Sequence, residues 1–177
     1  CGDSDVILME IGGYAANTID SIAREMGDRL LGVLEGTEAG HLRYLETAPK
    51  HLPVVAMSLS PLKSAESMMI GDSCVFSTER VLRDVDLLSE VKNIAVFGYG
   101  RVGKSVAHAS RVRGYSVQVF DIDPERRLEA LAGGFNIPAR RALLANADLL
   151  LAATGQRSWS VEDAEFMRDD ALLASCS

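Results

Sequence analysis

Three glycines are the residues of this chain whose spacing points most directly to chemistry. Gly98, Gly100 and Gly103 stand in a G-x-G-x-x-G arrangement directly after a short apolar run, Ile94 to Phe97. In such a turn Gly98 closes the bend, Gly100 lets backbone N–H groups approach a pyrophosphate, and Gly103 lets the next helix pack closely on the strand. The positive N-terminal end of that helix would point at the phosphates.

The residues that follow these glycines support a dinucleotide site. A helical stretch, Val102 to Arg113, comes after the turn, and a second apolar run, Val117 to Phe120, ends on Asp121. An acid at that point accepts hydrogen bonds from the adenosine ribose hydroxyls and would repel a 2′-phosphate. The sequence therefore predicts NAD as the cofactor in preference to NADP, against the alternative of a glycine turn that binds nothing.

The elements that must position these residues predict an α/β fold with a doubly wound parallel sheet, the Rossmann NAD-binding arrangement. Helical and apolar runs alternate after residue 90, and Asp148 to Ala152 predicts a buried strand that ends at Thr154-Gly155-Gln156. Ligands bind at the carboxyl ends of such strands. A plain turn is the alternative for Thr154-Gly155-Gln156. We expect Ser160 to cap a last helix, with Glu162 and Asp163 in its first turn.

A small α/β unit is expected before this domain. Its strands are predicted near residues 6–9, 30–34 and 53–57, with a polar loop over 35–40 and a helical turn over 41–45. The predicted division is therefore 1–63 for the small α/β unit, 64–90 for connecting helices with a break at Gly71-Asp72, and 91–177 for the NAD-binding domain.

Composition limits the classes of partner. The 177 residues are 47% hydrophobic and 24% charged, values typical of a globular protein that buries a core, and the net charge is −7 without a basic run. We therefore expect neither nucleic acid nor membrane as a partner. The absence of a long apolar stretch or visible signal peptide favours a cytoplasmic location. Cys1, Cys74 and Cys176 have no ligand spacing, so we expect free thiols and no metal.

The motifs resemble those of a known family. Three stretches of the sequence are similar to the G-Y-G-D-V-G-K, E-I-D-P and T-G-N motifs of S-adenosylhomocysteine hydrolase: Gly98 to Lys104, Asp121 to Pro124, and Thr154 to Gln156. Three earlier stretches resemble its D-D-G-G, E-E-T-T-T-G and S-V-T-K-S motifs: Glu10 to Gly13, Glu35 to Gly40, and Ser60 to Ser64. The chain thus resembles a divergent, shortened relative, most specifically in its cofactor half, and the first third resembles the end of the substrate domain.

The resemblance implies bound NAD⁺ that oxidises the ribose 3′-hydroxyl of the substrate, after which the C4′ proton becomes acidic and the thiol is eliminated. It implies Lys63 as the catalytic candidate, with a solvated surface lysine as the alternative. Thr37 would contact the nicotinamide half or be an ordinary turn threonine. Several positions depart from the family: Ile11 stands where it has aspartate, Gly36 where it has glutamate, and Ser67 and Met68 where it has aspartate and asparagine. Arg101 also stands where the family has aspartate.

These observations predict one site and leave several functions open. Arg101 could meet a phosphate through its guanidinium or point to water. The predicted cofactor-binding residues are Gly98, Tyr99, Gly100, Arg101, Val102, Gly103, Asp121, Ile122, Thr154, Gly155, Gln156 and Thr37. The leading hypothesis is NAD-dependent redox chemistry on a nucleoside-like or sugar-like alcohol, with a small-molecule substrate and a homo-oligomer left open. The alternatives are a non-catalytic NAD(H)-binding regulatory or sensing module, and a fragment of a full hydrolase.

Overall fold

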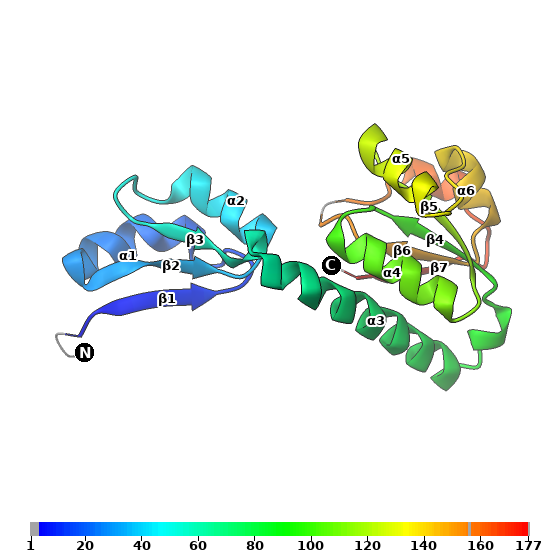
Figure 1. Cartoon of the computed structure of the whole chain (residues 1–177), viewed down its shortest axis with the longest axis horizontal. Coiled ribbons are helices and arrows are strands. Elements are labelled where there is room, and N and C mark those ends of the chain that lie inside the picture. Colours follow the sequence, from blue (N-terminus) through cyan, green and yellow to red (C-terminus); the bar gives the residue numbers. More distant parts are fainter. Residues whose placement is uncertain (1–3, 156, 177) are drawn as a thin grey trace. The chain divides into compact units, whose positions relative to one another are not determined.

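The computed structural model describes residues 4–155 and 157–176, and the chain forms two compact units, Cys1–Lys63 and Ser64–Ser177. The first unit has a parallel sheet of three strands in the order β1-β2-β3 (Figure 1). Its elements are β1 (Val6–Glu10), α1 (Ile19–Met26), β2 (Leu30–Glu35), α2 (Glu38–Thr47) and β3 (Val54–Ala56).

One face of this sheet is covered and the other is open. Val33 at the centre of β2 packs with Ile19 of α1 and Tyr44 of α2 in an apolar cluster. The opposite face exposes Met9 of β1 and Val55 of β3. The period of two along a strand accounts for this, because neighbouring residues point to opposite faces.

Helix α2 is longer than the sequence predicted. The helical turn expected over 41–45 lies within α2, but the loop expected over 35–40 is wrong from Glu38 onward, because α2 already begins there. The Thr37 side chain caps it by accepting a hydrogen bond from the N–H of Gly40. Threonine is a favoured residue at the N-terminal cap of a helix. Its bond to the Gly40 N–H satisfies a donor that has no acceptor within the helix, and this fixes the start of α2 at Glu38.

The second unit contains a parallel sheet of four strands in the order β5-β4-β6-β7 (Figure 1). The strands are β4 (Asn93–Phe97), β5 (Ser116–Phe120), β6 (Leu149–Ala152) and β7 (Leu172–Ser175). The α-helices are α3 (Pro61–Asp84, whose first residues belong to the first unit), α4 (Arg101–Val112), α5 (Pro124–Ala132) and α6 (Arg140–Asn146).

Both faces of this sheet are buried. In β4, Ile94 and Val96 belong to an apolar cluster that also holds residues of α3, α4 and α5, whereas Ala95 and Phe97 belong to a second cluster with residues of α6. A parallel sheet with helices on both faces is the doubly wound arrangement, so the predicted fold class is confirmed.

Helix α3 is continuous through the break predicted at Gly71-Asp72, so that prediction is wrong. A Cβ on Gly71 would lie 2.2 Å from Oγ of Ser105 and 2.6 Å from its carbonyl carbon. The Ser105 hydroxyl donates to the carbonyl of Met68 over 2.7 Å. Gly71 therefore allows α3 and α4 to pack closely within the second unit, and it does not interrupt the helix.

The last helix predicted after Ser160 is a short 3₁₀ helix, Glu162–Phe166, and Ser160 does not cap it. A capping Ser160 would accept a backbone N–H through its side chain. In the structure the backbone N–H of Ser160 donates to Oδ2 of Asp163 over 2.8 Å. The other 3₁₀ turns are Ala16–Thr18, Gly27–Arg29, Met57–Leu59 and Leu88–Glu90. Among the residues that the structure describes, no helix is long and apolar enough to cross a membrane.

Candidate functional site

The glycine turn connects β4 to α4, and each glycine has a different neighbour. Gly98 has φ +95°, which favours glycine, and a Cβ there would lie 2.8 Å from the carbonyl oxygen of Ala153. A Cβ on Gly103 would lie 1.9 Å from the carbonyl oxygen of Gly98. At Gly100 the nearest atom in the described part of the chain would be Nη1 of Arg126, at 3.5 Å. The backbone at Gly100 is therefore open to a ligand.

The start of α4 faces this opening. Gly100 is the N-terminal cap, and the first helical hydrogen bond runs from the N–H of Lys104 to the carbonyl of Gly100 over 2.9 Å. The geometry of an α-helix leaves its first N–H groups without acceptors inside the helix, and the helix dipole makes this end positive. This arrangement suits a phosphate.

Asp121 joins the end of β5 to the glycine turn. Its Oδ2 accepts the N–H of Tyr99 over 2.6 Å, and its Oδ1 accepts the N–H of Asp123 over 2.9 Å. The side chain is only 5% exposed. A carboxylate offers about four acceptor positions, so two of them stay available for hydroxyl groups of a ligand.

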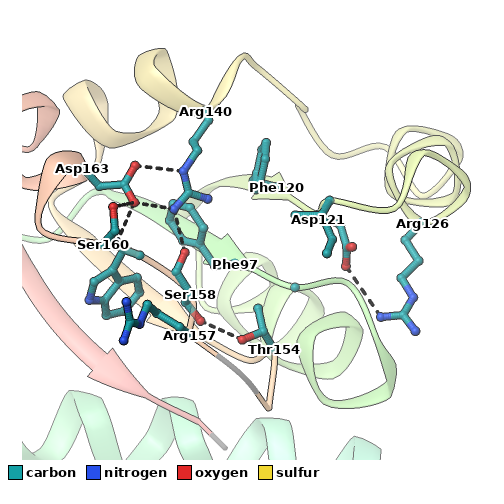
Figure 2. Close-up of a pocket in the computed structure, with 13 residues that line it drawn as sticks. Phe97, Phe120, Asp121, Arg126, Arg140, Thr154, Arg157, Ser158, Ser160 and Asp163 are labelled. Carbon is teal, nitrogen blue, oxygen red and sulfur yellow. Dashed lines mark hydrogen bonds and ion pairs between the residues drawn. The ribbon is translucent and has the colours of Figure 1, made fainter.

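A cavity of about 550 Å³ lies at the carboxyl ends of β4 and β5 and beside the loop after β6 (Figure 2). Ligand cavities of proteins are typically about 300–1,000 Å³. The walls combine aromatic rings with charged and hydroxyl side chains: Phe97, Gly98, Phe120, Asp121, Ile122, Arg126, Arg140, Thr154, Arg157, Ser158, Trp159, Ser160 and Asp163. The position and the mixture of groups suit a ligand that has flat, polar and anionic parts.

Arg140 fixes one wall of the cavity. Its guanidinium donates to Asp163 from Nε over 2.9 Å and from Nη2 over 2.6 Å, and Nη2 also donates to the carbonyl of Ser158 over 2.7 Å (Figure 2). The same group lies 5.0 Å from the ring centre of Phe97 and 5.1 Å from that of Phe120. The Arg140 hydrogen bond lowers the pKa of Asp163, so the carboxylate stays charged and holds the loop.

The structure brings four predicted cofactor-binding residues together at this cavity, namely Gly98, Asp121, Ile122 and Thr154. The Thr154 hydroxyl shares a 2.9 Å hydrogen bond with that of Ser158. Gly100 and Gly155 lie in the adjoining turns, where Gly155 has φ +67°, and Gly103 lies in the first turn of α4. Gln156 lies outside the described residues.

Three of the predicted residues do not present their side chains to the cavity. The Tyr99 ring is 2% exposed and packs on Phe135 in the core, so only its backbone N–H takes part, through the bond to Asp121. Val102 packs against the same core. Arg101 lines a second hollow, formed by residues of α3 and α4 within the second unit.

Thr37 has a structural position in the first unit. Its hydroxyl donates to Oε1 of Glu35 over 2.8 Å and accepts the N–H groups of Gly40 and Gly12. Glu35 is fully buried. Burial favours a raised pKa for Glu35, but hydrogen bonds from Thr37, Gly12 and Gly13 outweigh it and the pKa is lowered. These contacts fit the alternative of a turn threonine.

Other residues that the resemblance singled out also lie outside the cavity. Lys63 is in the first turn of α3 and belongs to the first unit, whereas the cavity is built wholly from the second. Ile11 packs on Gly36, where a Cβ would lie 2.7 Å from Cγ2 of Ile11. Met68 is 72% exposed on α3.

Sequence reasoning missed the aromatic and arginine residues of the cavity. Phe97 and Phe120 are the last residues of their strands, and this position was the available signal, since ligands bind at that edge. Trp159 packs edge-on against Phe97 with ring centres 5.7 Å apart. Arg140 gave no signal in the sequence, because its partners depend on how the loops fold. Arg126 follows Asp121 by five residues, and an arginine near that acid was an available signal.

The thiols of Cys74 and Cys176 are free and share a hydrogen bond within the second unit. Burial and the neighbouring Cys74 thiol raise the pKa of Cys176 to about 12, so it stays protonated at neutral pH. Over residues 4–155 and 157–176, no three His, Cys, Asp or Glu side chains gather in a group that could hold a metal ion.

Comparison with known families gives one match that covers more than half of the chain. The family described as "S-adenosyl-L-homocysteine hydrolase, NAD binding domain" matches residues 71–177. An adenosylhomocysteinase of Thermotoga maritima is 31% identical over 172 residues, which are 95% of this chain and 42% of the relative. One of Aeropyrum pernix is 34% identical over 160 residues, 86% of this chain and 37% of the relative. The chain spans about two fifths of the length of these relatives.

Solved structures share the fold at low sequence identity. A formate dehydrogenase of Granulicella has a TM-score of 0.67 at 12% identity, covering 97% of this chain and 51% of that chain. A phosphoglycerate oxidoreductase of Vibrio cholerae has a TM-score of 0.57 at 14% identity, covering 97% and 75%. At these identities the likeness concerns the fold.

Proposed function

Because this chain belongs to the family of the S-adenosyl-L-homocysteine hydrolase NAD-binding domain, we propose that it holds its cofactor, NAD, in the cavity at the carboxyl edge of β4 and β5. We further propose that the cofactor serves redox chemistry on an alcohol of a nucleoside-like or sugar-like substrate. The observation that carries the proposal is the junction of the glycine turn with Asp121 at one cavity.

The residues present fit the parts of a dinucleotide. The open backbone at Gly100 and the first turn of α4 would take the pyrophosphate, since no Cβ stands in the way. The two unused acceptor positions of Asp121 would take the hydroxyls of the adenosine ribose. Phe97, Phe120 and Trp159 supply aromatic surface for a flat base.

The chemistry of the cofactor sets what this chain must do. When bound, NAD⁺ accepts a hydride from a carbon that bears a hydroxyl group. The residues of the second unit would bind and orient it, and the rigid Arg140–Asp163 wall would keep the cavity in shape. We propose that Lys63 of the first unit helps to transfer the proton of the substrate hydroxyl. This role rests on the match of Lys63 to the family motif.

A second candidate function, a non-catalytic NAD(H)-binding or sensing module, is favoured by one contact. Ile11 and Gly36 stand at the positions of two acids of the hydrolase motifs. The Ile11 side chain fills the place that a side chain on Gly36 would need. An apolar pair at these positions cannot transfer a proton or hold a ribose hydroxyl.

The two functions differ in whether an alcohol reduces the cofactor. Protein loaded with NAD⁺ is mixed with adenosine or S-adenosylhomocysteine, and the near-ultraviolet absorbance of NADH is followed. Redox function predicts NADH formation that Lys63→Met reduces by about 100-fold, the typical contribution of a proton-transfer group. Lys50→Met is the control, because Lys50 is an exposed lysine of the same unit. Tight NAD⁺ binding without any NADH would overturn the redox proposal and support the sensing module.

A further inference from the structure

We propose that Arg126 is a phosphate-binding residue of the cofactor site, and that its guanidinium exchanges the carboxylates of Asp121 and Asp123 for a phosphate ester of the dinucleotide. The inference rests on the proposed function, because it presumes that the dinucleotide occupies the cavity. It adds a specificity-determining residue that the glycine motif does not contain.

The first argument is position. Arg126 is the third residue of α5 and lines the cavity. Its Nη1 lies 3.5 Å from the point where a Cβ on Gly100 would stand and 3.9 Å from Oδ2 of Asp121. Figure 2 shows the Asp121 and Arg126 side chains pointing toward one another. The guanidinium thus lies between the expected place of the pyrophosphate and the expected place of the adenosine ribose.

The second argument is that the partners of Arg126 are loosely held. Its Nε lies 3.6 Å from Oδ2 of Asp123, and both this distance and the 3.9 Å to Asp121 exceed a normal N–H···O hydrogen bond of about 2.7–3.2 Å. The side chain is half exposed, at 51%. Arg140, on the same cavity, makes three bonds of 2.6–2.9 Å and is not free to move. Arg126 can therefore turn to a new anion at low cost.

The third argument is charge. A dinucleotide would bring its phosphates close to the carboxylates of Asp121 and Asp123, on a chain whose net charge is −7. Like charges at short range repel each other, so a cation between them lowers the free energy of the complex. A guanidinium binds phosphate oxygens through two parallel N–H groups, which a lysine cannot do. Arg126 is in place for both effects.

Two phosphate groups have this chemistry. The pyrophosphate is common to NAD and NADP, and the 2′-phosphate is found in NADP alone. An arginine near the acid at the end of the second strand is the usual means of accommodating a 2′-phosphate in this fold. If Arg126 contacts the 2′-phosphate, its positive charge offsets part of the repulsion between the Asp121 carboxylate and that phosphate, and the preference for NAD over NADP becomes smaller.

The test compares Arg126→Gln with wild type in calorimetric titrations with NAD⁺ and NADP⁺. Adenosine, which has no phosphate, is titrated while backbone amide chemical shifts are recorded. Arg83→Gln is the matched control, because Arg83 is exposed in the last turn of α3 and the charge change is the same. Thermal unfolding shows that both variants are folded. We expect Arg126→Gln to weaken at least one dinucleotide by about 10- to 100-fold, the range of a lost charge-assisted hydrogen bond, and to leave adenosine unchanged.

The pattern of losses identifies the phosphate. Weaker binding of both dinucleotides assigns Arg126 to the pyrophosphate, and weaker binding of NADP⁺ alone assigns it to the 2′-phosphate. Unchanged affinity for both dinucleotides, or an equal loss of affinity for adenosine, overturns the inference. In either case NAD⁺ binding by wild type still supports the proposed function. A wild type that binds neither dinucleotide overturns both.

Discussion

At the scale of single residues, the three glycines of the turn differ in what stands beside each of them. Gly98 and Gly103 are enclosed by backbone atoms of Ala153 and Gly98, so the fold itself needs them. Gly100 is open except for the half-exposed end of Arg126, and its φ of −71° is accessible to any residue. We therefore expect Gly98 and Gly103 to be required for folding and Gly100 to be required for binding the dinucleotide.

We expect Gly100→Val to abolish NAD⁺ binding while the chain stays folded. The added methyl groups would occupy the space of the pyrophosphate and block backbone N–H groups. Each lost hydrogen bond to a charged group costs about 1.5–3 kcal/mol, so two lower the affinity by about 100-fold or more. Gly103→Val is the comparison, because it should lower the unfolding temperature. A folded Gly100→Val protein with unchanged NAD⁺ affinity would show that the phosphate lies elsewhere.

The sequence predicted the residues whose role depends on local backbone geometry and missed those whose role depends on distant partners. Gly98 and Asp121 belong to a motif of fixed spacing, so they could be identified from the sequence. Arg140 and Asp163 are twenty-three residues apart, and their ion pair exists only because the loop before the 3₁₀ helix returns to the start of α6. No local pattern encodes that return.

At the scale of elements, α3 shows that a helix-breaking residue can be required by packing. Gly71→Ala should remove a helix-propensity cost of about 1 kcal/mol, because alanine is the better helix former. The new Cβ would lie 2.6 Å from the carbonyl carbon of Ser105, a backbone atom that cannot rotate away. Overpacking costs about 1–3 kcal/mol, so the contact outweighs the propensity.

We therefore expect Gly71→Ala to lower the free energy of unfolding, measured by urea titration of the circular dichroism signal. Ser73→Ala is the control, because Ser73 is exposed on the same helix and the change should be neutral or slightly stabilising. A Gly71→Ala protein that is more stable than wild type would refute the close packing of α3 on α4.

The loop that closes the cavity should respond to acid. Asp163 has a pKa below its ordinary value of 3.8, because Arg140 hydrogen-bonds to its charged form. A lowered carboxyl pKa contributes stability above the ordinary pKa, and this contribution is lost as pH falls through the folded value. Asp163→Asn should thus lower the free energy of unfolding at neutral pH by about 1–3 kcal/mol, the cost of losing a charged hydrogen bond.

The measurement is denaturant unfolding of wild type and Asp163→Asn between neutral pH and the lowest pH at which wild type folds. The difference between the two proteins should shrink as the medium becomes more acidic. Asp170→Asn serves as control, since that carboxylate is exposed and pairs with the exposed Arg168. A difference that is independent of pH would contradict the role of the charged Asp163.

Element boundaries were predicted where one chemical signal acts alone. Asp123 caps α5 and Pro124 occupies its first turn, and both residue types favour a helix start at these positions. At Ser160 two signals compete, because the Asp163 carboxylate that accepts the Ser160 N–H is also bound by Arg140. The competing partner belongs to another element, so sequence reasoning expected an α-helix where the chain forms a 3₁₀ turn.

At the scale of the whole molecule, the chain matches about two fifths of its adenosylhomocysteinase relatives, and its first unit carries apolar residues at positions where the family motifs have acids. Glu10 and Glu35 are acids beside these positions, and Glu35 is fully buried with hydrogen bonds from the N–H groups of Gly12 and Gly13. Glu10 is the less buried of the two. Its carboxylate accepts hydrogen bonds from the N–H of Ala15 and the Tyr44 hydroxyl, so it has structural partners.

We expect the chain to release no detectable homocysteine from S-adenosylhomocysteine, even when loaded with NAD⁺. General acid–base groups contribute about 10²–10⁴-fold each, and Ile11, Gly36 and Met68 cannot supply them. Released homocysteine is measured over time with a thiol-specific reagent, and the Thermotoga maritima adenosylhomocysteinase is the positive control. Turnover of about one per second would refute the prediction and make Glu10 a catalytic candidate beside Lys63.

The most direct measurement of the central claim is a calorimetric titration of the protein with NAD⁺, NADH, NADP⁺ and NADPH, repeated with Asp121→Asn. The account predicts that wild type binds NAD⁺ and NADH more tightly than the phosphorylated cofactors, because Asp121 accepts ribose hydroxyls and repels a 2′-phosphate. Asp121→Asn should weaken NAD⁺ by about 10-fold and reduce the preference over NADP⁺. Equal or tighter binding of NADPH by wild type would contradict the account.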